Sequence, residues 1–105
     1  MRYTEERRAY KLLRLRKNGE LASPFINRRP ALPLGVWLQA FDFRTKGFAH
    51  RPGWHCCHAP EAPHIGMAGR VWAEVVIRDY YHFQRPKNQG GLWFIAEWMR
   101  IERVM

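Results

Sequence analysis

Residues 70–78 constrain the fold of this chain more than any other segment. Apolar residues that suit a core recur there at every second position, as Val71, Ala73, Val75 and Ile77. Successive side chains of a β-strand point to opposite faces, so this alternation predicts a strand with one face packed on a core. Such a strand needs neighbours, and the other strands must come from the rest of the 105 residues.

Three other segments favour strands. Residues 36–41 are rich in β-favouring side chains, residues 54–57 follow the turn-forming Pro52-Gly53 pair, and residues 92–96 are a continuous apolar run. Weak alternation continues beyond that run. Residues 92–104 therefore favour a strand, with a helix as the alternative.

Residues 4–17 also allow two interpretations. A helix would begin at Thr4 and end at Asn18-Gly19. Against it, Leu13 and Leu15 alternate with arginines, and Asn-Gly is the strongest two-residue hairpin turn. We therefore expect a hairpin, in which residues 20–26 pair back on the first strand.

The remaining segments read as tail or loop. Residues 1–8 are expected to form a flexible amino-terminal tail, and residues 9–105 a single compact β-rich domain. Residues 59–69 and 79–91 are expected to be loops, the former with at most one helical turn. The predicted fold class is α+β, with a mostly antiparallel, strongly bent β-sheet and one or two short helices.

The charge is basic and uneven. The chain carries 18 Lys and Arg against 9 Asp and Glu, and residues 1–30 hold nine of the former and three of the latter. A concentrated positive field attracts polyanions, although a solvated surface is the alternative. An arginine side chain can form two parallel hydrogen bonds to a phosphate. Tyr10 is expected on the same face as Arg14, where its ring could stack on a base. The sequence predicts a nucleic acid or an acidic protein surface as partner, bound by Arg14, Arg16, Lys17, Arg28, Arg29 and Arg51.

Histidines and cysteines gather between residues 50 and 64. A zinc site would take its ligands from His50, His55, Cys57 and His64. However, neighbours on a strand point oppositely, and the chain has no Cys-x-x-Cys pair. We expect no metal and no cofactor, with the cysteines packed as small apolar groups. A Cys–His nucleophilic pair is the weaker alternative, because no oxyanion-binding turn is evident.

The sequence also bears on location. No run approaches the roughly 20 apolar residues that span a membrane, and the charged start is unlike a signal peptide. Adjacent cysteines do not form an ordinary disulfide framework. We expect free thiols, no membrane association and a cytoplasmic protein.

Two segments of the chain are similar to a known group of domains. They are Arg-Pro-Gly-Trp-His at residues 51–55, and Gly-Arg-Val-Trp followed by an alternating strand at residues 69–77. Over about residues 10–105 the chain resembles a group of uncharacterised small domains of bacteriophages and prophages. The resemblance implies a phage-type accessory protein in the host cytosol, with inhibition of a host defence or nucleic-acid enzyme as one use.

The layout of that group is similar to the ADP-ribosyltransferase-like fold. This likeness implies, as an alternative, a nucleotide-binding enzyme with a nicotinamide nucleotide and with His55, Tyr81 and Glu97 as catalytic residues. No strong catalytic signature is present, so the leading interpretation is a non-catalytic protein that binds an anionic partner. A zinc-stabilised binding domain is the other alternative.

Overall fold

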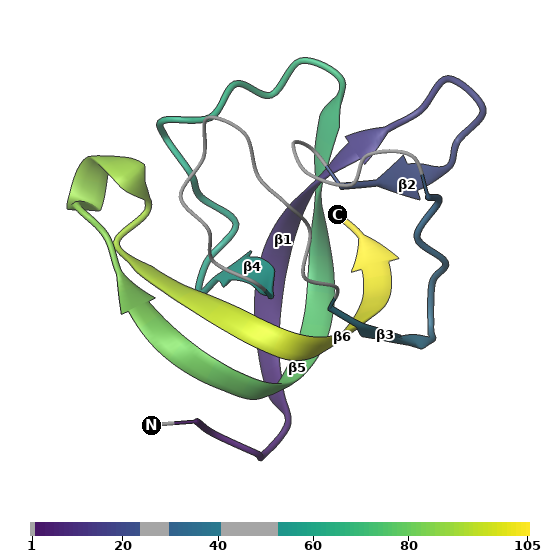
Figure 1. Ribbon diagram of the computed structural model, residues 1–105. Helices are drawn as coiled ribbons and strands as arrows, with labels where there is room; N and C mark the ends of the chain where they lie inside the picture. The colour runs from purple at the N-terminus through teal and green to yellow at the C-terminus, as the bar shows by residue number, and fades with distance from the viewer. Residues whose placement is uncertain (1, 24–29, 41–52) are drawn as a thin grey trace.

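The computed structural model describes residues 2–23, 30–40 and 53–105 (Figure 1). Six strands and one 3-10 turn follow in chain order. They are β1 (Arg7–Leu15), β2 (Leu21–Ala22), β3 (Trp37–Gln39), β4 (Trp54–Cys57), β5 (Arg70–Gln84), η1 (Lys87–Gln89) and β6 (Leu92–Val104).

The strands form one antiparallel sheet that closes on itself. The long strands β5 and β6 pair along their length, β1 lines the other edge of β5, and β3 and β4 line the other edge of β6. Tyr10 of β1 pairs with Cys57 of β4, which completes the ring β1–β5–β6–β4. Figure 1 shows β5 and β6 as one sharply bent ribbon. The expectation of a strongly bent antiparallel sheet is confirmed.

The expected α+β class is wrong, because the fold is nearly all β. Within the three described ranges the helical structure is the turn Lys87–Gln89, and no α-helix occurs. Residues 59–69 form turns without a helical segment. Pro60 and Pro63 lack the backbone N–H that a helix needs, and Thr4 starts no helix because the following residues join the sheet.

Both ambiguous segments are strands. Arg14 pairs with Ala22 and Leu15 with Leu21, while the Arg16 amide donates to the Glu20 carbonyl at 2.9 Å. The predicted hairpin is therefore confirmed, but its turn is not the expected two-residue one. The pairing leaves Lys17, Asn18 and Gly19 in the loop, and only Gly19 of the three has a positive φ. Residues 92–104 form β6, as favoured. In each case the backbone N–H and C=O groups form hydrogen bonds with a neighbouring strand. The alternation of side chains within one segment does not show which strand that neighbour is.

Two element boundaries differ from expectation. Strand β1 begins at Arg7, before the expected domain start, and Tyr3 exchanges backbone hydrogen bonds of 2.7 and 3.0 Å with Tyr80. Strand β5 continues to Gln84 through residues expected to be loop. The aromatic side chains of that part suit a strand, and their polar neighbours lie on its exposed positions.

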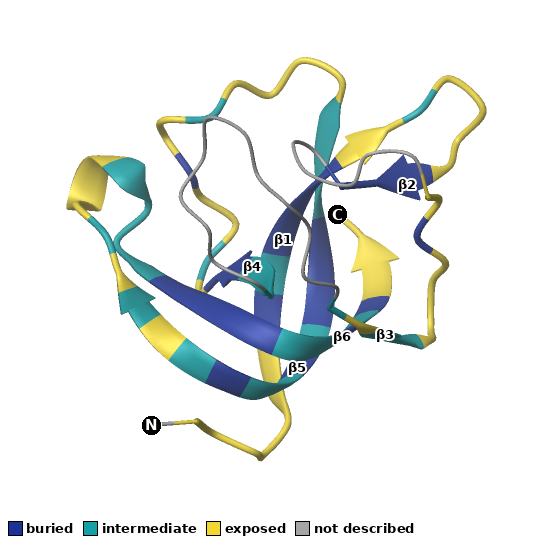
Figure 2. Cartoon of the chain, in the orientation of Figure 1, coloured by how far each residue is buried: buried dark blue, intermediate teal, exposed yellow. Residues whose placement is uncertain are grey.

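The main core fills the inside of the ring. Leu13, Val75, Ile77, Phe94 and Met99 are all fully buried there (Figure 2). A second cluster of Cys57, Ala62 and Trp93, with Ile65, Trp72 and Phe83 against it, involves the loop that follows β4. The alternation predicted for residues 70–78 thus marks the inner face correctly.

At one point of the long β5–β6 ribbon the alternation of inward and outward side chains shifts by one residue. Ile77 and Tyr80 of β5 lie three residues apart, yet both belong to the main core, as do Ala96 and Met99 of β6. Between them Asp79 has a φ of 52°, the one positive value described for a residue other than glycine. This left-handed residue lets the ribbon bend while apolar side chains stay inside on both sides of the bend.

Candidate nucleic-acid interface

The strand register defines a continuous outer face on β1, β5, β6 and β3. Residues paired across antiparallel strands project to the same side of a sheet. Arg8 pairs with Val76, Val76 with Arg100, and Arg100 with Trp37. Since Ala9 and Val75 point into the core, this row points outward. Six arginines of the described residues occupy the outer face: Arg8, Arg14, Arg70, Arg78, Arg100 and Arg103.

The hairpin supplies one end of this face. Arg14 and Lys17 are exposed, and Arg16 is half-buried with a long ion pair of 3.5 Å to Glu20. Arg14 pairs directly across the sheet with Arg70 of β5. Like charges opposite each other on neighbouring strands repel, so this end of the face has a cost in stability that a bound anion would relieve.

A buried carboxylate holds the middle of the face. Glu74 is 8% exposed, and its two oxygens accept from Arg8 at 2.7 Å and from Arg103 at 2.8 Å. One negative charge thus fixes two arginines that are largely exposed. The trio keeps a net positive charge and holds both guanidinium groups at defined places on the surface.

Three of the predicted anion-binding residues lie in the part of the chain that the structure describes. Arg14, Arg16 and Lys17 lie together on the hairpin. Arg28, Arg29 and Arg51 fall outside the described residues, as does His50 of the alternative zinc site.

Of the six arginines on the outer face, sequence reasoning named only Arg14. It missed the other five and the two tryptophans beside them: Arg8, Arg70, Arg78, Arg100, Arg103, Trp37 and Trp98. Trp37, Arg78, Trp98 and Arg100 come from three strands and approach one another only through the β3–β6–β5 register. Strands were expected at the positions of Trp37, Trp98 and Arg100. The sequence did not indicate to which face of the sheet these side chains point. Arg78 ends the predicted strand 70–78, on its face away from the core, and that is the one signal available beforehand.

The two cysteines lie in β4 and are buried. Burial raises the pKa of Cys56 to about 11, partly offset by the Lys11 charge. Burial, then the neighbouring Cys56, raises the pKa of Cys57 to about 12, offset in part by Lys11 and Arg85. Both are thiols at neutral pH, and a cysteine nucleophile needs a thiolate. The geometry thus supports packing as their role.

The alternative zinc ligands are held by other contacts. His55 and Cys57 pair with Ile95 and Trp93 in the β4–β6 ladder, and the His64 ring meets the Trp93 ring edge-on at 5.9 Å. Burial, then the charge of Arg85, lowers the pKa of His64. Within the described ranges no group of three or more His, Cys, Asp or Glu side chains is arranged to hold a metal ion.

The alternative catalytic residues lie near one another in the sheet. His55 and Tyr81 both pair with Ile95, from opposite edges of β6, and Glu97 follows two residues later. Ile95 between them is 1% exposed. The Tyr81 ring lies 5.8 Å from the Arg2 guanidinium, and Glu97 accepts a 3.0 Å hydrogen bond from Gln39. These contacts account for Tyr81 and Glu97 without a substrate.

Lys11 is the one buried lysine among the described residues, at 7% exposure. It shares the inner side of β1 with Ala9 and Leu13. Its Nζ donates to the His55 carbonyl at 2.8 Å and lies 5.9 Å from the Trp54 ring centroid. Burial lowers the pKa of Lys11, against the opposing influence of Cys56 and Cys57. The amine therefore belongs to the core and not to the outer face.

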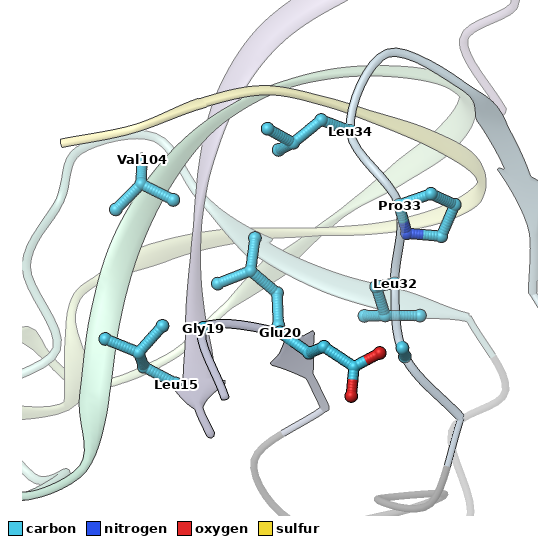
Figure 3. A pocket seen from close by; sticks show the side chains of 9 residues that line it. Leu15, Gly19, Glu20, Leu32, Pro33, Leu34 and Val104 are labelled. Atoms are coloured by element: carbon cyan, nitrogen blue, oxygen red, sulfur yellow. The ribbon is translucent and has the colours of Figure 1, made fainter. Parts of the chain in front are cut away.

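An open groove of about 400 Å³ lies beside the hairpin (Figure 3). Its lining is largely apolar, and Leu15, Leu34 and Val104 face it from three segments of the chain. A lining of this kind does not suit a phosphate or a carboxylate. The groove is therefore separate from the candidate interface.

No helix of the described residues is long and apolar enough to cross a membrane. Comparison of the chain with protein-family models, with curated proteins and with solved structures finds no match.

Proposed function

We propose that this protein is a non-catalytic domain that binds nucleic acid through its outer face. The observation that carries the proposal is the register itself, which gathers six arginines from three strands on one side of the sheet. Against them stand Glu74 and Glu102, each already bound to arginine. A polymer with many phosphates suits a surface that carries several guanidinium groups.

Nucleic acid is favoured over an acidic protein by the aromatic side chains on the same face. Tyr10, Trp37 and Trp98 lie at outward positions between the arginines. Arginine paired with flat rings suits phosphates and bases together, whereas an acidic protein surface needs the charges alone. The raised pKa values of Cys56 and Cys57 give no support to a thiol-based enzyme.

Reversing charge on the hairpin is the direct test. We expect Arg14→Glu with Lys17→Glu to weaken binding of single-stranded DNA by roughly tenfold or more. The slope of log affinity against log salt should fall by about one for each phosphate that the variant no longer neutralises. Fluorescence anisotropy over a salt series measures both quantities.

A control variant separates a local contact from bulk charge. Lys87 lies exposed on η1, outside the outer face, and Lys87→Glu makes the same charge change per residue. We expect it to leave the affinity within about twofold of the wild type. An equal decrease in log affinity per reversed residue in both variants would mean that net charge alone attracts the polymer. Tighter binding of polyglutamate than of DNA would favour an acidic protein partner.

A further inference from the structure

We infer that Trp37, Arg78, Trp98 and Arg100, here called the Arg–Trp stack, form a site on which the unpaired bases of a single strand lie. The inference rests on the proposed function and narrows its ligand from nucleic acid in general to single strands.

The geometry of the stack is that of alternating flat groups. The Arg78 guanidinium carbon lies 4.4 Å from the Trp37 ring centroid and 5.0 Å from that of Trp98. The Arg100 guanidinium lies 4.8 Å from the Trp37 centroid. A guanidinium this close to an indole gains both cation–π and stacking energy, which holds the rings in place.

Three paired strands, β3, β5 and β6, position the side chains of the stack. Arg78 pairs with Trp98, Gln39 also pairs with Trp98, and Trp37 pairs with Arg100. The four side chains are half-buried. A platform fixed by strand register needs little ordering when a base arrives, so less binding energy is spent on side-chain entropy.

The two arginines of the stack differ in charge balance. Arg100 is neutralised by Glu102, with Nη2 and Nε at 2.6 and 2.7 Å from the same oxygen. Arg78 forms no ion pair with any residue in the ranges that the structure describes. Its flat faces serve the rings, and its N–H edge stays available for a phosphate oxygen.

The stack continues the outer face of the hairpin. The row Arg8, Val76, Arg100, Trp37 joins it to β1, and Arg14 lies six residues further along that strand. Six strand residues span roughly 20 Å. A single strand of several nucleotides is long enough to span that distance. Its bases would lie on the rings of the stack and its phosphates on the exposed arginines. A duplex presents no free base face, because its bases are already stacked on one another.

The test compares strands that share phosphates but differ in bases. The probes are an oligothymidylate of about 12 nucleotides, within the usual range of single-strand sites, and an abasic strand of the same length. We expect the wild type to bind the oligothymidylate roughly tenfold tighter than the abasic strand, with quenching of tryptophan fluorescence. A duplex of equal length should not quench the tryptophan fluorescence, because its bases are already stacked on one another.

Three variants assign that difference to the stack. Trp98→Leu keeps an apolar side chain without a flat ring and should remove the preference for the oligothymidylate over the abasic strand. Trp98→Phe should retain most of the preference. Arg78→Lys keeps the charge but loses the planar group, and should reduce the preference. Thermal unfolding confirms that each variant is folded before binding is measured.

The outcomes separate the two proposals. Equal affinity of the wild type for the two strands would overturn the base-stacking site and leave the proposed function standing, as would a Trp98→Leu variant that keeps the preference. Failure of the wild type to bind either strand at low salt would overturn the proposed function and this inference with it.

Discussion

Gly53→Ala is expected to lower the free energy of unfolding by about 3–5 kcal/mol, from overpacking and backbone strain together. A Cβ at this position would lie 2.5 Å from Cγ2 of Ile95 and 3.1 Å from the Ala96 carbonyl oxygen. Ile95 is 1% exposed and branched, so its methyl group has no room to move aside. The φ of 134° adds strain for any residue with a side chain. Urea denaturation measures the decrease.

Gly19→Ala is the matched control. Gly19 also has a positive φ, of 88°, but nothing lies within 4 Å of a Cβ there. Its replacement by alanine should cost about 1 kcal/mol, the backbone strain alone. A Gly53→Ala variant no less stable than Gly19→Ala would contradict the close approach of β4 to β6. In a double-mutant cycle, Ile95→Ala should make the Gly53→Ala cost smaller by about 1 kcal/mol or more, because the clashing methyl group is gone.

The second large expected effect is an increase in stability. Lys11→Met is expected to raise the free energy of unfolding at pH 7 by about 1–3 kcal/mol, since a buried ammonium gives way to an apolar chain of similar shape. The variant cannot form the hydrogen bond from Lys11 to the His55 carbonyl, which offsets about 1 kcal/mol of the gain. Lys17→Met, at an exposed position, should change stability by less than about 0.5 kcal/mol.

The pH dependence of this gain has a definite sign. Burial lowers the pKa of Lys11 in the folded state below its value of 10.5, so between these two pKa values the unfolded chain binds more protons. Stability of the wild type therefore rises with pH in that window, and the cost of Lys11 is full below it. The advantage of Lys11→Met should be constant at low pH and shrink as pH approaches 10.5.

The cysteines act in the opposite direction at higher pH. Their folded pKa values of about 11 and about 12 exceed the ordinary 9.0, so above pH 9 the folded state holds protons that the unfolded chain releases. Stability falls with pH there, and it should fall more steeply in Lys11→Met, which lacks the opposing rise. Chemical denaturation at a series of pH values tests both slopes. An advantage independent of pH, or a decrease of stability at pH 7, would show that Lys11 is not a desolvated cation.

Prediction from sequence succeeded where a local signal and the tertiary contacts agree. Asn18-Gly19 marked the hairpin turn, where Gly19 takes a φ of 88°, and the alternation at residues 70–78 marked the inner face. It was wrong at residues 79–84, where polar residues suggested a loop and the chain forms a strand. It was also wrong in expecting one or two short helices. Of the candidate interface, the sequence named the hairpin residues Arg14, Arg16 and Lys17. Basic residues of the hairpin stand out in the sequence, whereas the Arg–Trp stack depends on pairing between distant strands.

The amino-acid sequence by itself determined the local character of this protein: short-range alternation and turn residues specify strands, and charge counts specify a cationic amino-terminal part. Only the tertiary structure decided how the strands pair, because register depends on contacts between residues far apart in the chain. That register closes the ring through Tyr10 and Cys57, buries Lys11 and sets Trp37 and Trp98 against Arg78. A one-residue slip would turn those side chains to the other face and leave no interface to propose.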